Sequence, residues 1–507
     1  MSMRINLGVA MVCMINATAV QQQHHHSSSH EENAIIHLEP PPSLQSSNSP
    51  QCHRIISANE TETAIKSGYK GTFTWTTEEQ SLLFTASFYG NLLSLAFGGF
   101  LINRFGSKQV ALVSALGMTA TTALMPTAAY LGIYYFFAVK VVFGIFESPI
   151  YAALATSLSL WFPPNERSTA ASFFTSGSPL ASSLGTLIST QLCSSDFLDG
   201  WPLIFYFMSI ATIAWILIWI LFFTNNPKHC RMLSVKEKEY LSKENEGHSH
   251  PDGEEKPPLP LANIVSSPAT LAVMFATFAH YFTTSLMQNF LPTYSRDVLA
   301  LDFKSNGAFT SMTFTFKFLS KYILSFTADF LKSKKILTPT ISSKVFQSAA
   351  SFGVATVFIF LTFYIDCTKQ SEALFVLAFY GIFAAAANPG YFTSACSFAP
   401  MYTGMILSLM EGAGAIGHLA APFFVGLIVK HGQTNEWSIV FGMIVLVNIV
   451  GGFVFLRYGT ADIQKWAHPK TSSSNLITLE SSKKAERKES QCSLLKKKAS
   501  ELLQCVC

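Results

Sequence analysis

The chain has 507 residues, of which 49% are hydrophobic and 13% are charged, and its mean hydropathy is +0.33. This composition is typical of a polytopic membrane protein rather than of an array of soluble domains. The formal net charge is only +4, so neither nucleic acid nor an acidic surface is expected as a partner. The nine cysteines lack metal-ligand spacing and no phosphate-binding glycine loop is present, so we expect no metal, no cofactor, no catalytic residue and no nucleotide-driven transport.

Residues 1–20 combine a basic residue, a short apolar core and the small residues Ala17-Thr18-Ala19. Secretory signal peptides and short first transmembrane helices share this pattern. The apolar part has about 16 residues against the ~20 that cross a bilayer, so a helix here is expected to be truncated at its start. A polar loop over 21–75 follows, and we expect glycosylation at Asn16 and Asn59 if this loop lies outside the cytoplasm.

Eleven further apolar segments have about the length of a transmembrane helix, and with the first helix they form two sets of six around a charged linker. The layout predicts an all-α polytopic membrane protein with an N-terminal bundle (1–224), a linker (225–264), a C-terminal bundle (265–457) and a disordered tail (458–507). The eleven segments are 80–102, 109–130, 132–160, 169–192, 202–224, 268–294, 307–330, 345–365, 372–396, 404–430 and 437–457.

Lysine and arginine gather in the loops of one side of this predicted topology, for example at Arg104, in the linker and in the tail. The positive-inside rule therefore places both termini in the cytoplasm, with the membrane either plasma or lysosomal and vesicular. Cys52, Cys193 and Cys367 fall in the opposite loops, where a single disulfide is feasible but its partners are not assigned by the sequence.

Two charges lie inside one apolar segment. Lys140 and Glu147 are seven residues apart, so they share one face of a helix. An ionised side chain at the bilayer centre costs about 2.5–3.5 kcal/mol on insertion scales, so the pair needs a reason to be there. Either the two charges compensate each other within a packed bundle, or they face a water-filled path and handle an ion or a charged solute.

The segment ends in a turn that contains Trp161, Pro163, Pro164, Glu166, Arg167 and Ser168. This turn resembles the W-x-P-P-x-E-R-S sequence of the anion:cation symporters of the major facilitator superfamily, a family that holds sodium/phosphate cotransporters, sialin and vesicular glutamate transporters. The start at Arg4 resembles the first helix of that family, which favours a helix over a signal peptide. Further matches in chain order are Gly98-Gly99, Arg104-Phe-Gly106, Trp201-Pro202, Leu291-Pro292-Thr-Tyr294, Asn306-Gly307, Ala328-Asp329, Ala399-Pro400, Tyr402, Gly404, Glu436-Trp437, Val440-Phe441, Gln464 and Trp466.

The resemblance implies the major facilitator fold and secondary active transport of an organic anion or inorganic phosphate, coupled to protons or sodium by alternating access through a lipid bilayer. The family carries substrate-binding arginines on its first and fourth helices, which fall here on Arg4 and Lys140, and a proton-coupling carboxylate, which falls on Glu147. His280 takes the position of a further substrate contact on the seventh helix. Residues expected to act in gating at the cytoplasmic loops are Arg104, Glu166, Arg167 and Asp329.

The chain also departs from the family pattern near the expected chemistry. Lysine replaces arginine at position 140, and Glu411 appears in the eleventh helix together with His418. Glu411 is interpreted as a second proton-coupling site or an interbundle salt bridge, and Lys317 as structural or reaching toward the membrane surface rather than as a substrate contact. These departures keep two alternatives open, a transporter of an organic cation or neutral metabolite and a membrane binding protein without transport activity.

Overall fold

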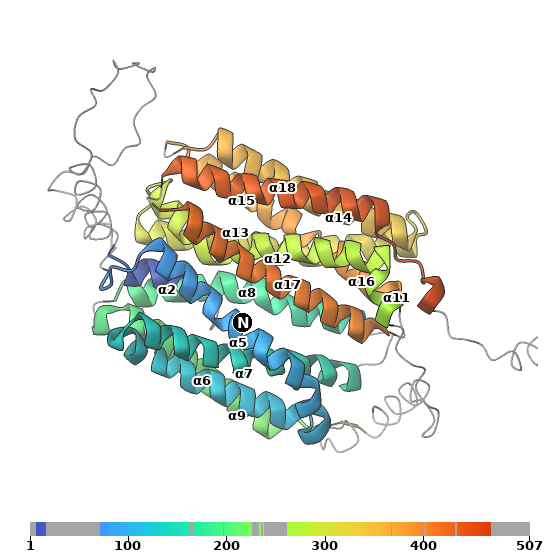
Figure 1. Cartoon of the computed structure of the whole chain (residues 1–507), viewed down its shortest axis with the longest axis horizontal. Coiled ribbons are helices and arrows are strands. Elements are labelled where there is room, and N and C mark those ends of the chain that lie inside the picture. Colours follow the sequence, from blue (N-terminus) through green and yellow to red (C-terminus); the bar gives the residue numbers. More distant parts are fainter. Residues whose placement is uncertain are drawn as a thin grey trace, which may run out of the picture.

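The computed structural model describes residues 7–16, 71–161, 167–195, 197–225, 233–234, 237, 261–366, 368–399, 402–430 and 433–467. Within these ranges the regular structure is helical apart from an isolated bridge between Ile15 and Phe73. The prediction of an all-α membrane protein is confirmed, because the long helices coincide with the predicted apolar segments (Figure 1).

The helices form two groups that follow each other in the chain, and the two groups lie on opposite sides of the molecule in Figure 1. The first group contains α2 (Leu7–Met14), α5 (Thr77–Phe105), α6 (Ser107–Leu131), α7 (Ile133–Trp161), α8 (Arg167–Cys193) and α9 (Trp201–Phe222). The second group contains α11 (Leu261–Ser266), α12 (Pro268–Asp297), α13 (Phe303–Ser333), α14 (Pro339–Phe363), α15 (Gln370–Ala385), α16 (Thr393–Ser397), α17 (Thr403–Ile428) and α18 (Thr434–Tyr458).

Several of the long helices have the length and composition of membrane spans. Among the described residues, seven helical spans are long and apolar enough to cross a membrane: Ser107–Leu131, Ile133–Leu154, Trp201–Phe222, Pro339–Phe363, Gln370–Ser397, Met405–Ile428 and Thr434–Tyr458. The long helices α12 and α13 are not in this set, and both carry polar or charged residues along their length, such as Gln288 and Lys317. α8 packs on α13, and α5 packs on α17, so these four helices meet at the boundary between the two groups.

Local signals explain where several helices begin. Thr76 caps α5 in a capping box, in which its hydroxyl accepts from the backbone of Glu79 and the Glu79 carboxylate accepts from the Thr76 backbone. Asp302 caps α13 by accepting from the backbone N–H of Ser305 at 3.1 Å. Gly106, at φ 83°, makes the sharp turn that lets α6 follow α5 directly. The Asp302 cap and the Gly106 turn each lie in a connection between two long helices.

A disulfide joins Cys13, near the end of α2, to Cys193, the last residue of α8. We call this the disulfide end of the molecule, and the opposite end, where α9 ends and α12 begins, the linker end. The predicted disulfide partner set included Cys193 but not Cys13, because the first helix was expected to run to residue 20. Instead α2 ends at Met14, and Asn16 pairs through its backbone N–H with the carbonyl of Phe73 at 2.8 Å.

The two groups touch most closely near the disulfide end. A Cβ on Gly307 of α13 would collide with the side chain of Thr190 of α8, and a Cβ on Gly426 of α17 would lie 2.8 Å from Ser81 of α5. Gly8 of α2 similarly faces the backbone carbonyl of Gln288 in α12, at 2.6 Å from an added Cβ. Glycine at these three positions lets helices of the two groups approach closely.

One predicted continuous segment, 372–396, is interrupted. α15 ends at Ala385, and a π-helical turn over Asn388–Phe392 precedes α16. Gly390 leaves helical geometry at φ −80° and ψ −107°, and the backbone N–H of Tyr391 donates to Gln347 Oε1 at 3.2 Å. Pro389 explains the break, because a proline inside a helix removes one backbone donor and clashes with the preceding turn.

Candidate functional site

A small cavity lies between the two helix groups. Its wall comes from five helices, α2, α5, α7, α12 and α17, so both groups contribute to it. The lining is mixed in polarity and consists of Leu7, Phe84, Ser87, Phe88, Lys140, Gln288, Asn289 and His418. A cavity with a buried cation, two amides and an imidazole suits a small polar or charged solute.

Lys140 is the cation of this cavity, and its side chain is only 1% exposed. Its Nζ lies 5.3 Å from the centroid of the Phe143 ring, which is itself fully buried. An aromatic face stabilises a desolvated ammonium but supplies no negative charge. The structure therefore places a positive charge at the boundary between the two groups, on a wall shared with Gln288 and Asn289.

Glu147 is fully buried on the same helix, two turns closer to the linker end than Lys140. Its Oε2 accepts a hydrogen bond from Asn91 Nδ2 of α5 at 3.3 Å. The two helices reach this distance because Gly90 and Gly144 stand where a Cβ would collide with the backbone of the neighbouring helix. Glu147 does not line the cavity, so the structure brings the two charges onto one helix without placing both in one pocket.

His418 and Glu411 occupy one side of α17, as their spacing of seven residues requires. His418 is 5% exposed, stacks on Phe88 of α5 with ring centroids 4.6 Å apart, and lines the cavity. Tyr281 of α12 connects the two residues: its ring lies 4.8 Å from the ring of His418, and its hydroxyl donates to Glu411 Oε1 at 3.3 Å. Glu411 itself is exposed.

His280 lies apart from the Lys140 cavity. It lines a second small cavity within the second, C-terminal group, together with Thr283, Thr284 and Asn448. Asn448 Nδ2 donates to Thr283 Oγ1 at 2.9 Å, so this wall is held by polar contacts between α12 and α18. The structure does not bring His280 onto the wall that carries Lys140.

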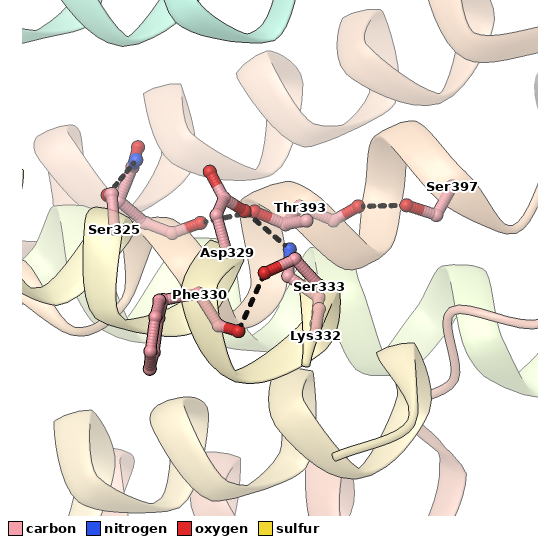
Figure 2. Close-up of polar contacts among 8 residues, drawn as sticks. Ser325, Asp329, Phe330, Lys332, Ser333, Thr393 and Ser397 are labelled. Atoms are coloured by element: carbon pink, nitrogen blue, oxygen red, sulfur yellow. Dashed lines mark hydrogen bonds and ion pairs between the residues drawn. The ribbon is translucent and has the colours of Figure 1, made fainter. Parts of the chain in front are cut away.

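Two of the predicted gating residues are described with their side chains. Arg104 is exposed in the last turn of α5, with its guanidinium carbon 5.9 Å from the Phe105 ring centroid. Asp329 pairs with Lys332 in the last turns of α13 at 2.8 Å, which Figure 2 shows near Thr393, the first residue of α16. In the same region Asn388 Nδ2 donates to Ser325 Oγ at 3.2 Å. Arg104 and Asp329 both lie at the linker end.

The remaining predicted site residues are placed only in part. Arg4, Glu166 and Asn59 lie outside the described residues. Arg167 is the first residue of α8, but its side chain is not among those described. Asn16 is half-buried next to the Ile15–Phe73 bridge, so glycosylation at this position stays a prediction.

The sequence interpretation missed the amides of the cavity. Gln288 and Asn289 are adjacent polar residues inside α12 and are 7% and 9% exposed. Gln288 Nε2 donates to Ser182 Oγ of α8 at 3.2 Å, which ties α12 to the opposite group. Adjacent amides inside a membrane helix were the available signal, because buried polar groups in a membrane need partners. Among the described residues, no cluster of His, Cys, Asp and Glu could hold a metal.

The sequence matches the profile of the Major Facilitator Superfamily over residues 61–365. This match covers more than half of the chain. The protein belongs to the major facilitator superfamily. It is therefore a member of a transporter family rather than an enzyme, and it is a multi-pass membrane protein.

Named relatives place this facilitator within the superfamily. It is 30% identical over 468 residues to the uncharacterized transporter slc-17.3 of Caenorhabditis elegans, across 92% of this chain and 86% of the relative. It is 25% identical over 397 residues to human sialin, across 78% of each chain. It is 25% identical over 398 residues to human sodium-dependent phosphate transport protein 1, across 78% of this chain and 84% of the relative. The resemblance to the sialin and phosphate-transporter group is confirmed.

Solved structures share the fold. The D-xylose-proton symporter superposes with a TM-score of 0.57 at 12% identity, over 91% of this chain and 97% of the symporter. A bacterial homolog of the human lysosomal transporter Spinster superposes with a TM-score of 0.58 at 12% identity, over 78% of this chain and 92% of the homolog. At this identity the likeness establishes the major facilitator fold and nothing about the solute.

Proposed function

We propose that this facilitator is a secondary active transporter of an organic anion or inorganic phosphate, driven by protons or sodium. The observation that carries the proposal is the buried ammonium of Lys140 on the wall of a cavity shared by both helix groups. A fixed cation offsets the desolvation of an anion that enters a membrane interior. Its relatives include sialin and sodium-dependent phosphate transport protein 1, and the phosphate in the second name is an anion.

The cavity offers a matched set of donors for an oxyanion. Lys140 supplies the charge, and the amides of Gln288 and Asn289 can each donate from the opposite group. A lysine binds an oxyanion as a point charge rather than through the planar fork of an arginine, so the amides would fix the orientation. An anion held by residues of both groups stabilises the closed arrangement of the two halves.

Glu147 is the proposed proton carrier. It is buried on the helix that carries Lys140, and Asn91 is its donor at 3.3 Å. A buried carboxylate binds a proton when its surroundings are dry and releases it when water or a nearby cation stabilises its charge. Movement of α5 against α7 would change that environment in each transport cycle. Glu411 is the second proposed proton site because its exposed carboxylate reaches the cavity region through Tyr281.

The close contacts at the disulfide end support the proposed alternating access. The glycine contacts Gly307–Thr190 and Gly426–Ser81 join the two halves there, and they must separate when the cavity opens to that side. We infer that this end faces away from the cytosol, since the Cys13–Cys193 disulfide fits an oxidising compartment. Both termini would then be cytoplasmic, in a plasma, lysosomal or vesicular membrane.

Uptake into proteoliposomes tests the proposal. The purified full-length protein is reconstituted, and the accumulation of phosphate, glucuronate, lactate and glutarate is measured under an imposed pH gradient and, separately, a sodium gradient. We expect at least one anion to accumulate, and we expect Lys140→Met to lower its apparent affinity at least tenfold. Absence of accumulation for every anion under both gradients would contradict the proposal and favour a membrane binding protein without transport activity.

A second candidate is transport of an organic cation, and the exposed carboxylate of Glu411 favours it. A cationic solute would bind Glu411 and Tyr281 instead of Lys140. The two candidates separate in the same proteoliposomes with tetraethylammonium and choline as probes. Accumulation that Glu411→Gln abolishes and Lys140→Met leaves unchanged would support the cation, and the reverse pattern would support the anion.

A further inference from the structure

Two lysines lie one turn apart in the middle of α13, where the anion site described above does not include them. Lys317 is only 8% exposed, and its Nζ donates to Thr284 Oγ1 of α12 at 3.2 Å. Lys321 is half-buried, and its Nζ donates to Thr175 Oγ1 of α8, in the opposite group, at 2.8 Å. Neither side chain extends toward the membrane surface, because both amines point toward other helices.

Charge is not balanced around these lysines. Within the part of the chain that the structure describes, no carboxylate lies within 4.0 Å of either Nζ, and the acceptors of both amines are neutral threonine hydroxyls. The ring of Tyr380 lies 5.9 Å from Lys317 Nζ and supplies only a weak attraction. A buried ammonium without a counter-charge is unfavourable, so a purely structural role would call for an acidic partner.

The protein holds Lys317 away from the lipid. Gly381 of α15 faces the backbone N–H of Lys317, at 2.8 Å from where a Cβ would stand, so α15 packs directly on this turn. The predicted reach of Lys317 toward the membrane surface is therefore wrong. The side chain is directed instead to Thr284, which lines the second cavity, in the C-terminal group.

Polar side chains lie between Lys317 and the Lys140 cavity. Thr284 and Gln288 are four residues apart on α12, which is one helical turn or about 6 Å along the axis. Gln288 lines the Lys140 cavity, and Thr284 accepts the hydrogen bond of Lys317. The polar residues near the two lysines therefore lie on successive turns of α12. On the opposite group Ser183 contacts Thr315 of α13 at 2.6 Å, which continues the polar boundary toward the lysines.

We propose that Lys317 and Lys321 form a second oxyanion subsite, which binds a carboxylate or phosphate group of the transported solute from the C-terminal half. The subsite rests on the proposed anion transport and adds the residues through which that half holds the solute. Two ammonium groups one turn apart suit an oxyanion, whose several oxygen atoms can each accept from a different donor. An oxyanion also supplies the counter-charge that both lysines lack among the described residues.

Binding at this subsite has a mechanical consequence. Lys321 joins the two helix groups through Thr175, so an anion that takes Lys321 as its partner competes with that hydrogen bond. Occupation of the subsite then loosens one contact between α8 and α13. The solute would thereby weaken this one contact, even though it joins the two halves at the Lys140 cavity.

The test is a titration of thermal stability on the purified full-length protein with phosphate, glucuronate and glutarate as probes, because a ligand that binds the folded state raises its melting temperature. We expect the Kd of the best probe to rise at least tenfold in Lys317→Met and at least threefold in Lys321→Met. Lys317→Arg, which keeps the charge, should stay within threefold of the wild type. Lys332→Met is the matched control, since Lys332 lies on the same helix and pairs with Asp329.

The outcomes separate the subsite from the proposed function. If Lys140→Met weakens binding and both Lys317→Met and Lys321→Met stay within twofold of the wild type, the subsite is overturned while anion transport stands. If no probe stabilises the wild-type protein, both proposals fail together. If Lys317→Met does not fold, the half-buried Lys321 provides the test. An unchanged Kd in Lys321→Met would then overturn the subsite. The ranking of phosphate against the two carboxylates identifies the group that is bound.

Discussion

Single residues carry most of the functional argument, beginning with the charges on α7. Lys140 and Glu147 could be predicted as buried from their place in an apolar segment, and both are buried. Their separate surroundings could not be predicted, because Asn91 and the amides of α12 come from segments distant in sequence. The sequence also gives no sign that Lys317 turns inward to Thr284, since helix periodicity does not tell a lipid-facing from a bundle-facing lysine.

At the residue scale, the contribution of the α13 cap to the stability of the fold can be tested. Hydrogen bonds from Ser305, first from its side chain and also from its backbone, hold the pKa of Asp302 below its ordinary value against the smaller opposing effect of burial. Asp302→Ala removes this cap, and we expect it to lower the free energy of unfolding by about 1 kcal/mol. Chemical denaturation in detergent at pH 7 measures the change.

The same aspartate predicts a pH dependence. Because its pKa is depressed in the folded protein, Asp302 stabilises the fold above its unfolded pKa, and this contribution disappears as the pH falls through its folded pKa. The melting temperatures of the wild type and Asp302→Ala should therefore converge on acidification from pH 7 toward pH 3. Asp302→Asn serves as a control that keeps much of the cap without the titration. A difference that does not depend on pH would contradict the assignment.

At the scale of helices, the sequence predicted the structure most completely. The predicted apolar segments from residue 80 onward each coincide with one helix, except 372–396, which is divided between α15 and α16. A spanning segment forms a helix because it must satisfy its own backbone hydrogen bonds. Two details escaped the prediction. The break at Asn388–Phe392 was marked by Pro389 and Gly390 but was hidden in a long apolar run. The early end of α2 at Met14 depends on the pairing of Asn16 with Phe73, which is a contact between distant segments.

Helix contacts predict a conformational phenotype for Gly307. Any side chain there meets Thr190 of α8, so Gly307→Val should prevent full closure of the two halves at the disulfide end. We expect faster labelling of a cysteine placed at Ser311 by a membrane-impermeant thiol reagent, together with impaired transport. Gly177→Ala on α8 is the control, since nothing lies within 4 Å of its added Cβ. Equal labelling rates in Gly307→Val and the wild type would show that this contact does not hold the halves together.

The whole molecule is linked across 180 positions of sequence by the Cys13–Cys193 disulfide. This bond fastens α2, which lies buried against α12 and α8, to the end of α8. We expect Cys13→Ser to lower the free energy of unfolding by about 2–4 kcal/mol. A reducing agent should lower the melting temperature of the wild type but not that of the variant. Cys396→Ser, which replaces a free cysteine, should change neither the free energy of unfolding nor the effect of the reducing agent.

Direct chemistry checks the same bond. Peptide mapping without reduction should recover Cys13 and Cys193 in one linked peptide pair from protein that was alkylated in its native membrane. Recovery of both residues as separately alkylated thiols would contradict the disulfide and, with it, the inferred non-cytosolic position of that end.

At the same scale, the central claim is that two halves move an anion past Lys140 while Glu147 carries the coupling proton. The most direct measurement compares two modes of transport in proteoliposomes that contain the wild type or Glu147→Gln. For the anion that the wild type accumulates, we predict that Glu147→Gln retains exchange of labelled for unlabelled solute but loses accumulation driven by a pH gradient, because a permanently neutral side chain can neither load nor release a proton. Accumulation by Glu147→Gln at the wild-type rate and level under the same pH gradient would contradict the account.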